Sequence, residues 1–213
     1  MFEVKMILDS MAPCGKRLTT ITATYPRFIH SEIMTHRDRA RNAASSRAIP
    51  WSKMREQIIN DPVIPLVFGS EQKGMQTGCE VDDPKAALEC WLNARDVALE
   101  RADWLHCYGV HKSIVNRIVE PWMWITVVMS ATEWKNFFRL RCHPDAEIHF
   151  QKIAGMIRDL LEASTPTPLA AWEWQSWNTV ERTCCEIIII PHSNNIRITV
   201  ISINYWVCIR PIS

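Results

Sequence analysis

The sequence lacks three features that would place it in a common functional class. No apolar stretch reaches the ~18 uninterrupted residues that a membrane-spanning helix needs. The formal net charge is only +1, so no overall field draws the chain onto DNA or an anionic membrane. The eight cysteines include no CxxC pair, and the histidines form neither an HExxH motif nor a Cys/His ligand set. We therefore expect no membrane, nucleic-acid or metal partner.

The composition that is present is typical of a folded domain. A chain of 213 residues with 47% hydrophobic and 22% charged residues is long enough to bury one substantial core and is not disordered throughout. One globular domain is the expectation, and a domain with an appendage is the alternative. The opening ten residues carry acidic side chains and no long apolar run, so they do not have the pattern of a signal peptide. We expect a cytoplasmic protein.

Three segments have the pattern of β-strands. Threonine and isoleucine alternate over residues 18–25 with the period of two that a half-buried strand shows, and residues 4–8 precede them across a turn. Residues 122–129 form a β-rich apolar run that is typical of a buried strand. Together these segments predict an antiparallel sheet built from an N-terminal hairpin and the strand at 122–129.

Apolar residues at three-to-four spacing predict helices in much of the remaining chain up to residue 166. The clearest helix begins with Asp-Asp-Pro at 82–84, which combines an N-cap acid with a proline in the first turn, and it ends at Gly109. Other helices are predicted at 52–59, 111–119, 133–140 and from about 145 to just before 166. The predicted fold class is α+β, with an antiparallel sheet packed against long helices.

The segment after the second strand also changes to helical spacing. Ile29, Ile33, His36 and Ala40 lie on one face of a helix there, and we predict such a helix with His36 on its inward side. Residues 42–50 lose the periodicity, contain two serines and end in proline. We therefore expect a structured loop after the helix.

Arginines and serines gather at the end of this predicted helix and in the loop. A phosphate or pyrophosphate needs several fixed donors, and arginine supplies a planar fork while serine hydroxyls and loop amides supply short hydrogen bonds. The donors here are Arg37, Arg41, Ser45, Ser46 and Arg47. They predict an anion-binding site. The alternative is a solvated helix end whose arginines face water.

These residues overlap a longer pattern. Its positions are Thr35, His36, Arg37, Asn42, Ser45 and Arg47. The pattern resembles the signature of the flavin-dependent thymidylate synthases (thymidylate synthase complementing proteins), in which an Arg-His-Arg triplet is followed at fixed spacing by asparagine, serine and arginine. Further resemblance to the phage-like, circularly permuted branch of this family lies in residues 25–50, 72–75, 111–121 and 131–145, and the likeness covers roughly residues 4–166.

The resemblance implies an activity and an assembly. In this family NADPH reduces a bound FAD, and methylene-tetrahydrofolate gives its one-carbon unit to C5 of dUMP, so that dTMP forms by reductive methylation. The family also implies a homotetramer with active sites between subunits, so that arginines of different chains meet one substrate. A phage-encoded member would act in the cytoplasm of a bacterial host.

The resemblance assigns four residues to the cofactor by matching position. His36, Arg37 and Asn42 would contact the flavin, and Asn136 of a later segment matches a residue on the flavin side. Thr35 replaces the first arginine of the family triplet. This departure removes a positive charge that would strengthen anion binding.

The resemblance assigns a second set of residues to the nucleotide. Ser45, Ser46 and Arg47 would hold its phosphate or sugar, and Arg141 matches a nucleotide-binding arginine. Lys112 stands near a basic nucleotide contact of the family, through an alignment that needs a gap. Among these residues, Ser45, Arg47 and Arg141 would be catalytic.

Glu32 is another departure, because many members carry a glutamine that faces the active site at this position. Two interpretations stay open. Glu32 lies one helical turn before His36 and can form a Glu–His pair, or it can bind substrate. Since a carboxylate accepts from the exocyclic amine of cytosine, dCMP is the alternative substrate to dUMP.

The chain changes character after Pro166. Residues 167–213 contain no lysine and lack the Arg-Val-Ser and Ser-Pro-Phe-Glu-His stretches that permuted members place at their C-terminus to close the flavin site. A shifted reading frame or a premature truncation would produce such a tail, and a genuine divergent β segment at 186–207 is the alternative. We favour the former. We therefore divide the chain into a thymidylate synthase-like domain at 1–166 and a tail at 167–213.

Three functions follow as hypotheses. The first is a flavin-dependent thymidylate synthase or a close relative that acts on a pyrimidine deoxynucleotide. The second is an inactive remnant that binds nucleotide or flavin, because the sequence lacks half of the flavin site. The third is a nucleic-acid-binding protein that uses the arginines of residues 37–47, and the near-neutral net charge disfavours it.

Overall fold

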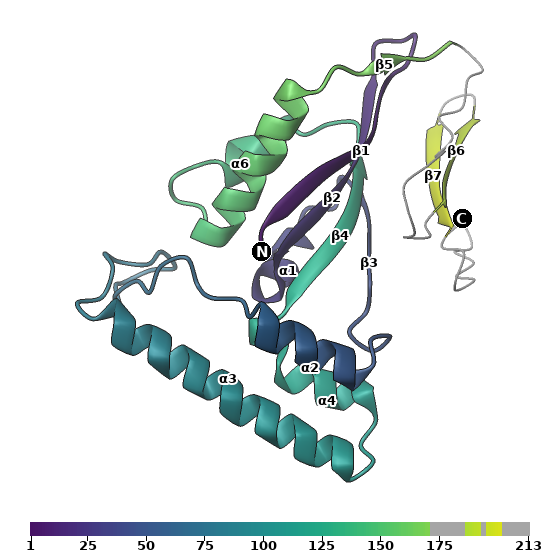
Figure 1. Ribbon diagram of the computed structural model, residues 1–213. Coiled ribbons are helices and arrows are strands. Elements are labelled where there is room, and N and C mark those ends of the chain that lie inside the picture. Colours follow the sequence, from purple (N-terminus) through teal and green to yellow (C-terminus); the bar gives the residue numbers. More distant parts are fainter. Residues whose placement is uncertain (171–185, 193–194, 202–213) are drawn as a thin grey trace.

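Five strands form one sheet, and helices pack against one face and one end of it (Figure 1). The structure is a computed structural model that describes residues 1–170, 186–192 and 195–201. The strands of this sheet are β1 (Glu3–Met11), β2 (Arg17–Pro26), β3 (Ala40–Ala43), β4 (Trp124–Ala131) and β5 (Thr167–Pro168). Their order is β3-β4-β2-β1-β5, with β3 at one edge, and the pairings are antiparallel except for the two-residue contact of β5 with β1. The predicted antiparallel sheet and the α+β fold class are confirmed.

Side chains alternate between the two faces of β2 and β4, as the period of two requires. Ile21 and Tyr25 of β2 and Met129 of β4 are buried on the face that the helices cover. On the opposite face, the hydroxyls of Thr20 and Ser130 hydrogen-bond across the two strands at 2.7 Å. The pattern of Thr and Ile in the sequence therefore corresponds to one polar and one apolar face.

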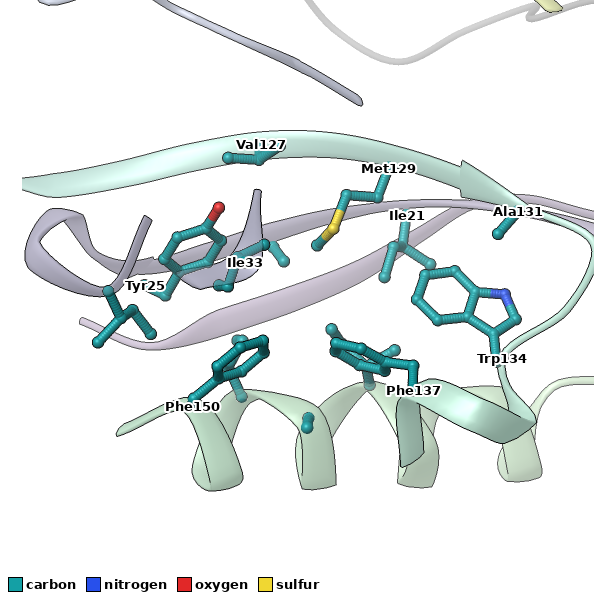
Figure 2. Packing of buried hydrophobic residues seen from close by; sticks show 14 of the residues in the cluster. Ile21, Tyr25, Ile33, Val127, Met129, Ala131, Trp134, Phe137 and Phe150 are labelled. Carbon is teal, nitrogen blue, oxygen red and sulfur yellow. The ribbon is translucent and has the colours of Figure 1, made fainter. Parts of the chain in front are cut away.

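Two helices, α5 (Lys135–Arg141) and α6 (Ile148–Ala163), cover the apolar face of the sheet. Figure 2 shows Phe137 of α5 and Phe150 of α6 pointing toward the strand residues Ile21 and Tyr25. The two phenylalanine rings lie 5.8 Å apart and both are buried. Burying one such side chain stabilises the fold by about 1.5–3 kcal/mol, so this aromatic layer fixes the position of α5 and α6.

A second core joins three further helices at one end of the sheet. They are α2 (Trp51–Asn60), α3 (Pro84–Cys107) and α4 (Lys112–Ile118). The Trp51 Nε1–H donates to the Asp103 carboxylate at 2.8 Å, which joins α2 to α3. The predicted start of the long helix is confirmed, because the Asp83 side chain accepts from the Ala86 N–H. Gly109 follows the helix with a φ of 78°, a left-handed conformation that glycine adopts at little cost.

A partly buried ion pair joins the hairpin to the end of α6. Arg17 donates to both carboxylate oxygens of Asp9 at 2.8 and 2.7 Å, and to the carbonyls of Leu161 and Ser164 at 2.9 and 3.2 Å. The Ser164 hydroxyl also donates to Asp9. These bonds satisfy carbonyls that the last turn of α6 leaves without helical partners, and they end the helix before Pro166.

The predicted helix through Ala40 is wrong beyond its first turns. The chain forms a 3-10 turn, η1 (Arg27–Ile29), and a short helix, α1 (His30–Ile33). The Thr35 hydroxyl then donates to the Glu32 carbonyl at 2.6 Å and competes with the helical bonds. Residues 40–43 pair with β4 as strand β3 instead, because a long-range ladder overrides the local periodicity. The predicted loop at 42–50 correspondingly begins two residues later, after Ala43.

The tail contains a two-stranded antiparallel sheet of β6 (Glu186–His192) and β7 (Asn195–Ile201). Both strands lie within the range 186–207 that we considered as a genuine β segment, and the remaining residues of that range lie outside the described part. The origin of the tail and the domain boundary at 166 stay predictions. None of the helices in the described residues is long and apolar enough to span a membrane.

Candidate nucleotide-binding site

His36 lies at the turn between α1 and β3, and its side chain is buried against α5 and α6. Its ring makes edge contacts with Phe137 and Phe150, with ring centroids 5.2 and 5.8 Å away. The His36 Nε2 accepts a hydrogen bond from the Arg141 Nε–H at 2.8 Å. This bond requires an unprotonated Nε2. Burial lowers the pKa of His36, and the nearby Arg141 and Arg39 lower it further.

Arg141 is the residue that joins the two segments of the family resemblance. It ends α5, and its guanidinium lies 4.4 Å from the centroid of the Phe150 ring. The bond to His36 uses its Nε, which leaves the two terminal nitrogens to donate elsewhere. The structure thus brings together His36 and Arg141, which are 105 residues apart in the sequence.

Arg41 has a structural use within this turn. Its Nη1 donates to the carbonyl of Ile33 at 3.2 Å and to the carbonyl of His36. Arg41 therefore holds the end of α1 against β3, and these carbonyls occupy donors that we had assigned to the predicted anion site.

Arg39 was not singled out from the sequence, and it is the most deeply buried cation of this region. Its side chain is fully buried and pairs with Asp38 at 2.9 Å. The guanidinium lies 4.1 and 4.8 Å from the ring centroids of Phe137 and Trp134. Its Nη1 has no hydrogen-bond partner among the described residues. Arg39 thus packs the signature segment against α5, and burial lowers its pKa.

Glu32 is half-buried on α1 and lies near Glu147, Arg141 and His149. Burial raises the pKa of its carboxyl, Glu147 raises it further, and Arg141 and His149 oppose the shift. A pair of Glu32 with His36, one of the two interpretations of this residue, is not among the ion pairs of the described residues, and the His36 Nε2 accepts from Arg141. The Glu32 carboxyl remains a candidate group for substrate.

The loop at 44–50 is attached to α4 through its backbone. The buried Asn116 donates from Nδ2 to the carbonyls of Ser46 and Ile49 at 2.7 and 3.0 Å. The Lys112 Nζ donates to the Ala48 carbonyl at 3.0 Å. Asn116 was not expected from the sequence, although an amide inside the apolar run from 114 to 119 was a signal that could have identified it.

Ser46 faces inward, unlike its neighbours in the loop. Its hydroxyl donates to the Glu120 carboxylate at 3.4 Å, and Glu120 forms an ion pair with Arg27 at 3.0 Å. A surface pocket of about 400 Å³ lies beside this pair. Its lining residues are Arg27, Phe28, His30, Ser31, Glu120 and Pro121.

The other predicted contact residues are exposed. Arg37 precedes β3, and Ser45 and Arg47 lie on the 44–50 loop. Asn42 lies on β3, and Asn136 accepts from Arg139 at 2.9 Å. The predicted residues therefore fall into two groups. The buried Ser46 and the bonded His36, Arg41, Lys112 and Arg141 contact other parts of the chain, while the exposed residues present donors to solvent.

These side chains form two sets, Ser45 and Arg47 on the 44–50 loop and Glu32, His36 and Arg141 around the end of α5. Arginine forks and a serine hydroxyl suit a phosphate, and the half-buried Glu32 offers a polar contact close to Arg141. No group of three or more His, Cys, Asp or Glu side chains in the described part of the chain has the geometry to hold a metal ion.

Comparison with solved structures shows that this arrangement of sheet and helices is similar to the fold of a UMP/dUMP methylase. The solved protein is PolB from Streptomyces cacaoi, bound with 5-Br dUMP in one structure (TM-score 0.59) and with 5-Br UMP in another (TM-score 0.61). Sequence identity is 14% in both, over 76% of this chain and 90% and 88% of the PolB chains. No protein-family model and no curated protein matches the sequence.

Proposed function

We propose that this protein is a flavin-dependent thymidylate synthase that binds dUMP and methylates its C5 carbon to form dTMP. The fold shared with PolB supports an enzyme that acts on a uridine nucleotide. The observation that carries the proposal is the pairing of His36 with Arg141 at 2.8 Å. This bond joins the signature segment to a later segment in which the family resemblance also places a nucleotide contact.

The backbone of the 44–50 loop supports a phosphate site. A trans peptide points its C=O and the following N–H to opposite sides. Because α4 binds the carbonyls of Ser46 and Ala48, the N–H groups of Arg47 and Ile49 point away from α4. The Arg47 N–H donates to the Ser45 hydroxyl oxygen at 3.3 Å, and the Ser45 O–H stays able to donate. In the proposed complex the Ser45 hydroxyl, the Arg47 guanidinium and the Ile49 N–H hold the phosphate. Ser46 supports the loop from the inner side through Glu120.

The nucleotide base would lie toward Arg141. The two terminal nitrogens of its guanidinium can donate to the base or to the phosphate of a ligand, and Phe150 and His36 hold the side chain in place. An arginine that donates to a ring carbonyl of uracil would also stabilise the negative charge that the ring carries when C5 attacks the one-carbon unit. Arg141, Ser45 and Arg47 are therefore the proposed catalytic residues.

The residues that the resemblance assigns to the flavin fit that cofactor with one exception. Arg37, Asn42 and Asn136 are exposed and carry donors that suit a pyrophosphate and a ring carbonyl. His36 does not fit a direct contact, because it is buried and its Nε2 is already bonded to Arg141. When bound, the FAD would supply the hydride that reduces the transferred one-carbon unit, with NADPH and methylene-tetrahydrofolate as co-substrates.

A homotetramer is part of the proposal. The long helix α3 carries Val97 and Trp104 with 54% and 52% of their surface exposed, and Tyr108 follows it with 74% exposed. Large apolar side chains gathered on one element are typical of subunit contacts. In such a tetramer the family resemblance implies that arginines of different chains meet one substrate.

Glu32 favours a second substrate. A half-buried carboxyl close to Arg141 can contact the 4-position of a pyrimidine, where cytosine has an amine and uracil a carbonyl. An ionised Glu32 selects dCMP, whereas a protonated Glu32 can donate to the carbonyl of dUMP. Replacement of Glu32 by glutamine therefore shifts the substrate preference toward dUMP if the carboxylate contacts the 4-position of the pyrimidine.

The test is to purify the protein, record flavin absorbance and assay NADPH oxidation and dTMP formation with dUMP, UMP and dCMP. We expect a yellow protein, or one that takes up added FAD, with oxidation stimulated by dUMP and with dTMP as the product. Arg47→Ala should lose this activity, and Arg158→Ala, a partly exposed arginine of α6, is the matched control. Bound dUMP and FAD without dTMP would identify the inactive remnant, and a protein that binds neither contradicts the proposal.

A further inference from the structure

Helix α4 contacts the 44–50 loop with two side chains on one face. Lys112 and Asn116 are four residues apart and so lie one helical turn from each other on the same side. Together they donate to the carbonyls of Ser46, Ala48 and Ile49 at 2.7 to 3.0 Å. Three carbonyls of a seven-residue loop thus have partners on a single helix face.

The orientation of the Asn116 amide follows from its partners. Two carbonyl oxygens lie within hydrogen-bond distance of one end of the side chain, and only the NH₂ group can donate to both. The Asn116 Oδ1 therefore points away from the loop, and it has no hydrogen-bond partner among the described residues.

This arrangement is costly for a purely structural residue. Asn116 is fully buried between Val115 and Val119 on the inner side of α4, where an apolar side chain would pack without an unpaired oxygen. Against this cost, the amide makes the two hydrogen bonds to the loop carbonyls. They fix the direction of the Ser46 carbonyl, and with it the N–H and the Cα of Arg47.

We propose that Asn116 is a positioning residue that orients the 44–50 loop, so that Arg47 and Ser45 present their donors to the phosphate of the nucleotide. This inference rests on the proposed nucleotide site and adds a residue that touches no substrate. Asn116 acts only through the loop backbone. Its effect should therefore fall on the phosphate contacts and leave contacts to the base unchanged.

The test compares dUMP with deoxyuridine, which differs from it by the phosphate alone. The dissociation constant of deoxyuridine divided by that of dUMP measures how much the phosphate contributes to binding. Asn116→Leu removes both donated bonds at similar volume, and we expect this ratio to fall about tenfold, the effect of roughly one net hydrogen bond to a charged group. Asn116→Ser keeps one donor and is expected to give an intermediate ratio.

Thr19→Val is the matched control. Thr19 is buried and, like Asn116, takes part in two side-chain bonds, one to the Ala131 carbonyl and one from Trp134, but it does not contact the loop. It should lower the melting temperature and leave the ratio unchanged. If Asn116→Leu does not fold, Asn116→Ser gives the test, since a ratio equal to that of the unmodified protein overturns the inference.

Hydrogen exchange separates this inference from the proposed function. Without nucleotide, the amide hydrogens of residues 44–50 should exchange faster in the Asn116 variants than in the unmodified protein and in Thr19→Val. Unchanged exchange overturns the inference even where dUMP binds. Faster exchange in a protein that binds no dUMP overturns the nucleotide site and keeps only the loop contact.

Discussion

Replacement of Arg141 by alanine tests the centre of the candidate site. The arginine donates to His36 at 2.8 Å and lies 4.4 Å from the Phe150 ring centroid, so its removal affects both folding and binding. For folding, loss of a cation–π contact of about 0.5–1 kcal/mol and of a hydrogen bond of about 0.5–1.5 kcal/mol gives about 1–2.5 kcal/mol. Urea denaturation measures this loss.

Loss of Arg141 should remove a larger share of the free energy of dUMP binding than of the free energy of folding. A hydrogen bond from a charged group contributes about 1.5–3 kcal/mol, so the dissociation constant of dUMP should rise roughly 10- to 150-fold. Arg141→Lys keeps the charge but not the planar fork, and it should recover only part of the affinity. Phe150→Leu is the control for position, because it removes the ring beneath the guanidinium and leaves the charge in place.

Calorimetric titration with dUMP, carried out at a temperature where all variants are folded, gives the required dissociation constants. Arg141→Ala should lose affinity beyond what Phe150→Leu loses, and both should lose some stability. An alanine variant that binds dUMP as tightly as the unmodified protein, while losing stability as expected, would refute the assignment. Arg141 would then be a structural partner of His36 only.

Three further predictions concern the packing around the site. Asp9→Asn should cost about 2–4 kcal/mol in urea denaturation, because it removes the negative charge that pairs with Arg17. Burial raises the pKa of Asp9, but the bonds from Arg17 and Ser164 lower it overall. This stability is therefore present above about pH 3.9 and is lost as pH falls through the pKa of Asp9 in the folded protein. Burial and Arg141 hold the pKa of His36 below about 6.5 in the folded state, so the free energy of unfolding should decline as pH falls below that value. His36→Gln should flatten this decline. An unchanged dependence of the free energy of unfolding on pH contradicts this prediction. Arg39→Met should change the free energy of unfolding by less than about 1 kcal/mol. The loss of the aromatic contacts offsets the gain from removing a buried charge with an unpaired nitrogen. A loss above about 3 kcal/mol would show that the charge itself stabilises the fold.

Local patterns predicted most of the fold, and they failed where a distant strand decided the structure. The long helix follows from Asp83 and its periodic apolar residues, and the hairpin follows from alternating Thr and Ile, because those signals lie within the elements themselves. The segment from Ile29 to Ala40 has equally clear helical spacing. Its end pairs instead with β4, some 90 residues later, and the local spacing carries no information about that distant strand.

The candidate site could be predicted as a set of residue types but not as a set of roles. Arg41 and Ser46 were expected to hold an anion, and both contact the chain itself, because an arginine or a hydroxyl satisfies an internal partner as readily as a phosphate. His36 and Arg141 were named for separate ligands and contact each other. Asn116 lies 70 residues from the loop carbonyl that it binds, so only the folded chain reveals its use.

The edge position of β3 has a consequence for how the site opens. This four-residue strand pairs with β4 on one side and has no second partner strand in the described part of the chain. Opening it therefore requires breaking one ladder and leaves the buried core between β2, β4 and α6 intact, so it should cost less than global unfolding. Residues 40–43 would then behave as a separate unit of local unfolding, and a ligand that contacts Asn42 would slow hydrogen exchange there without changing exchange in β2.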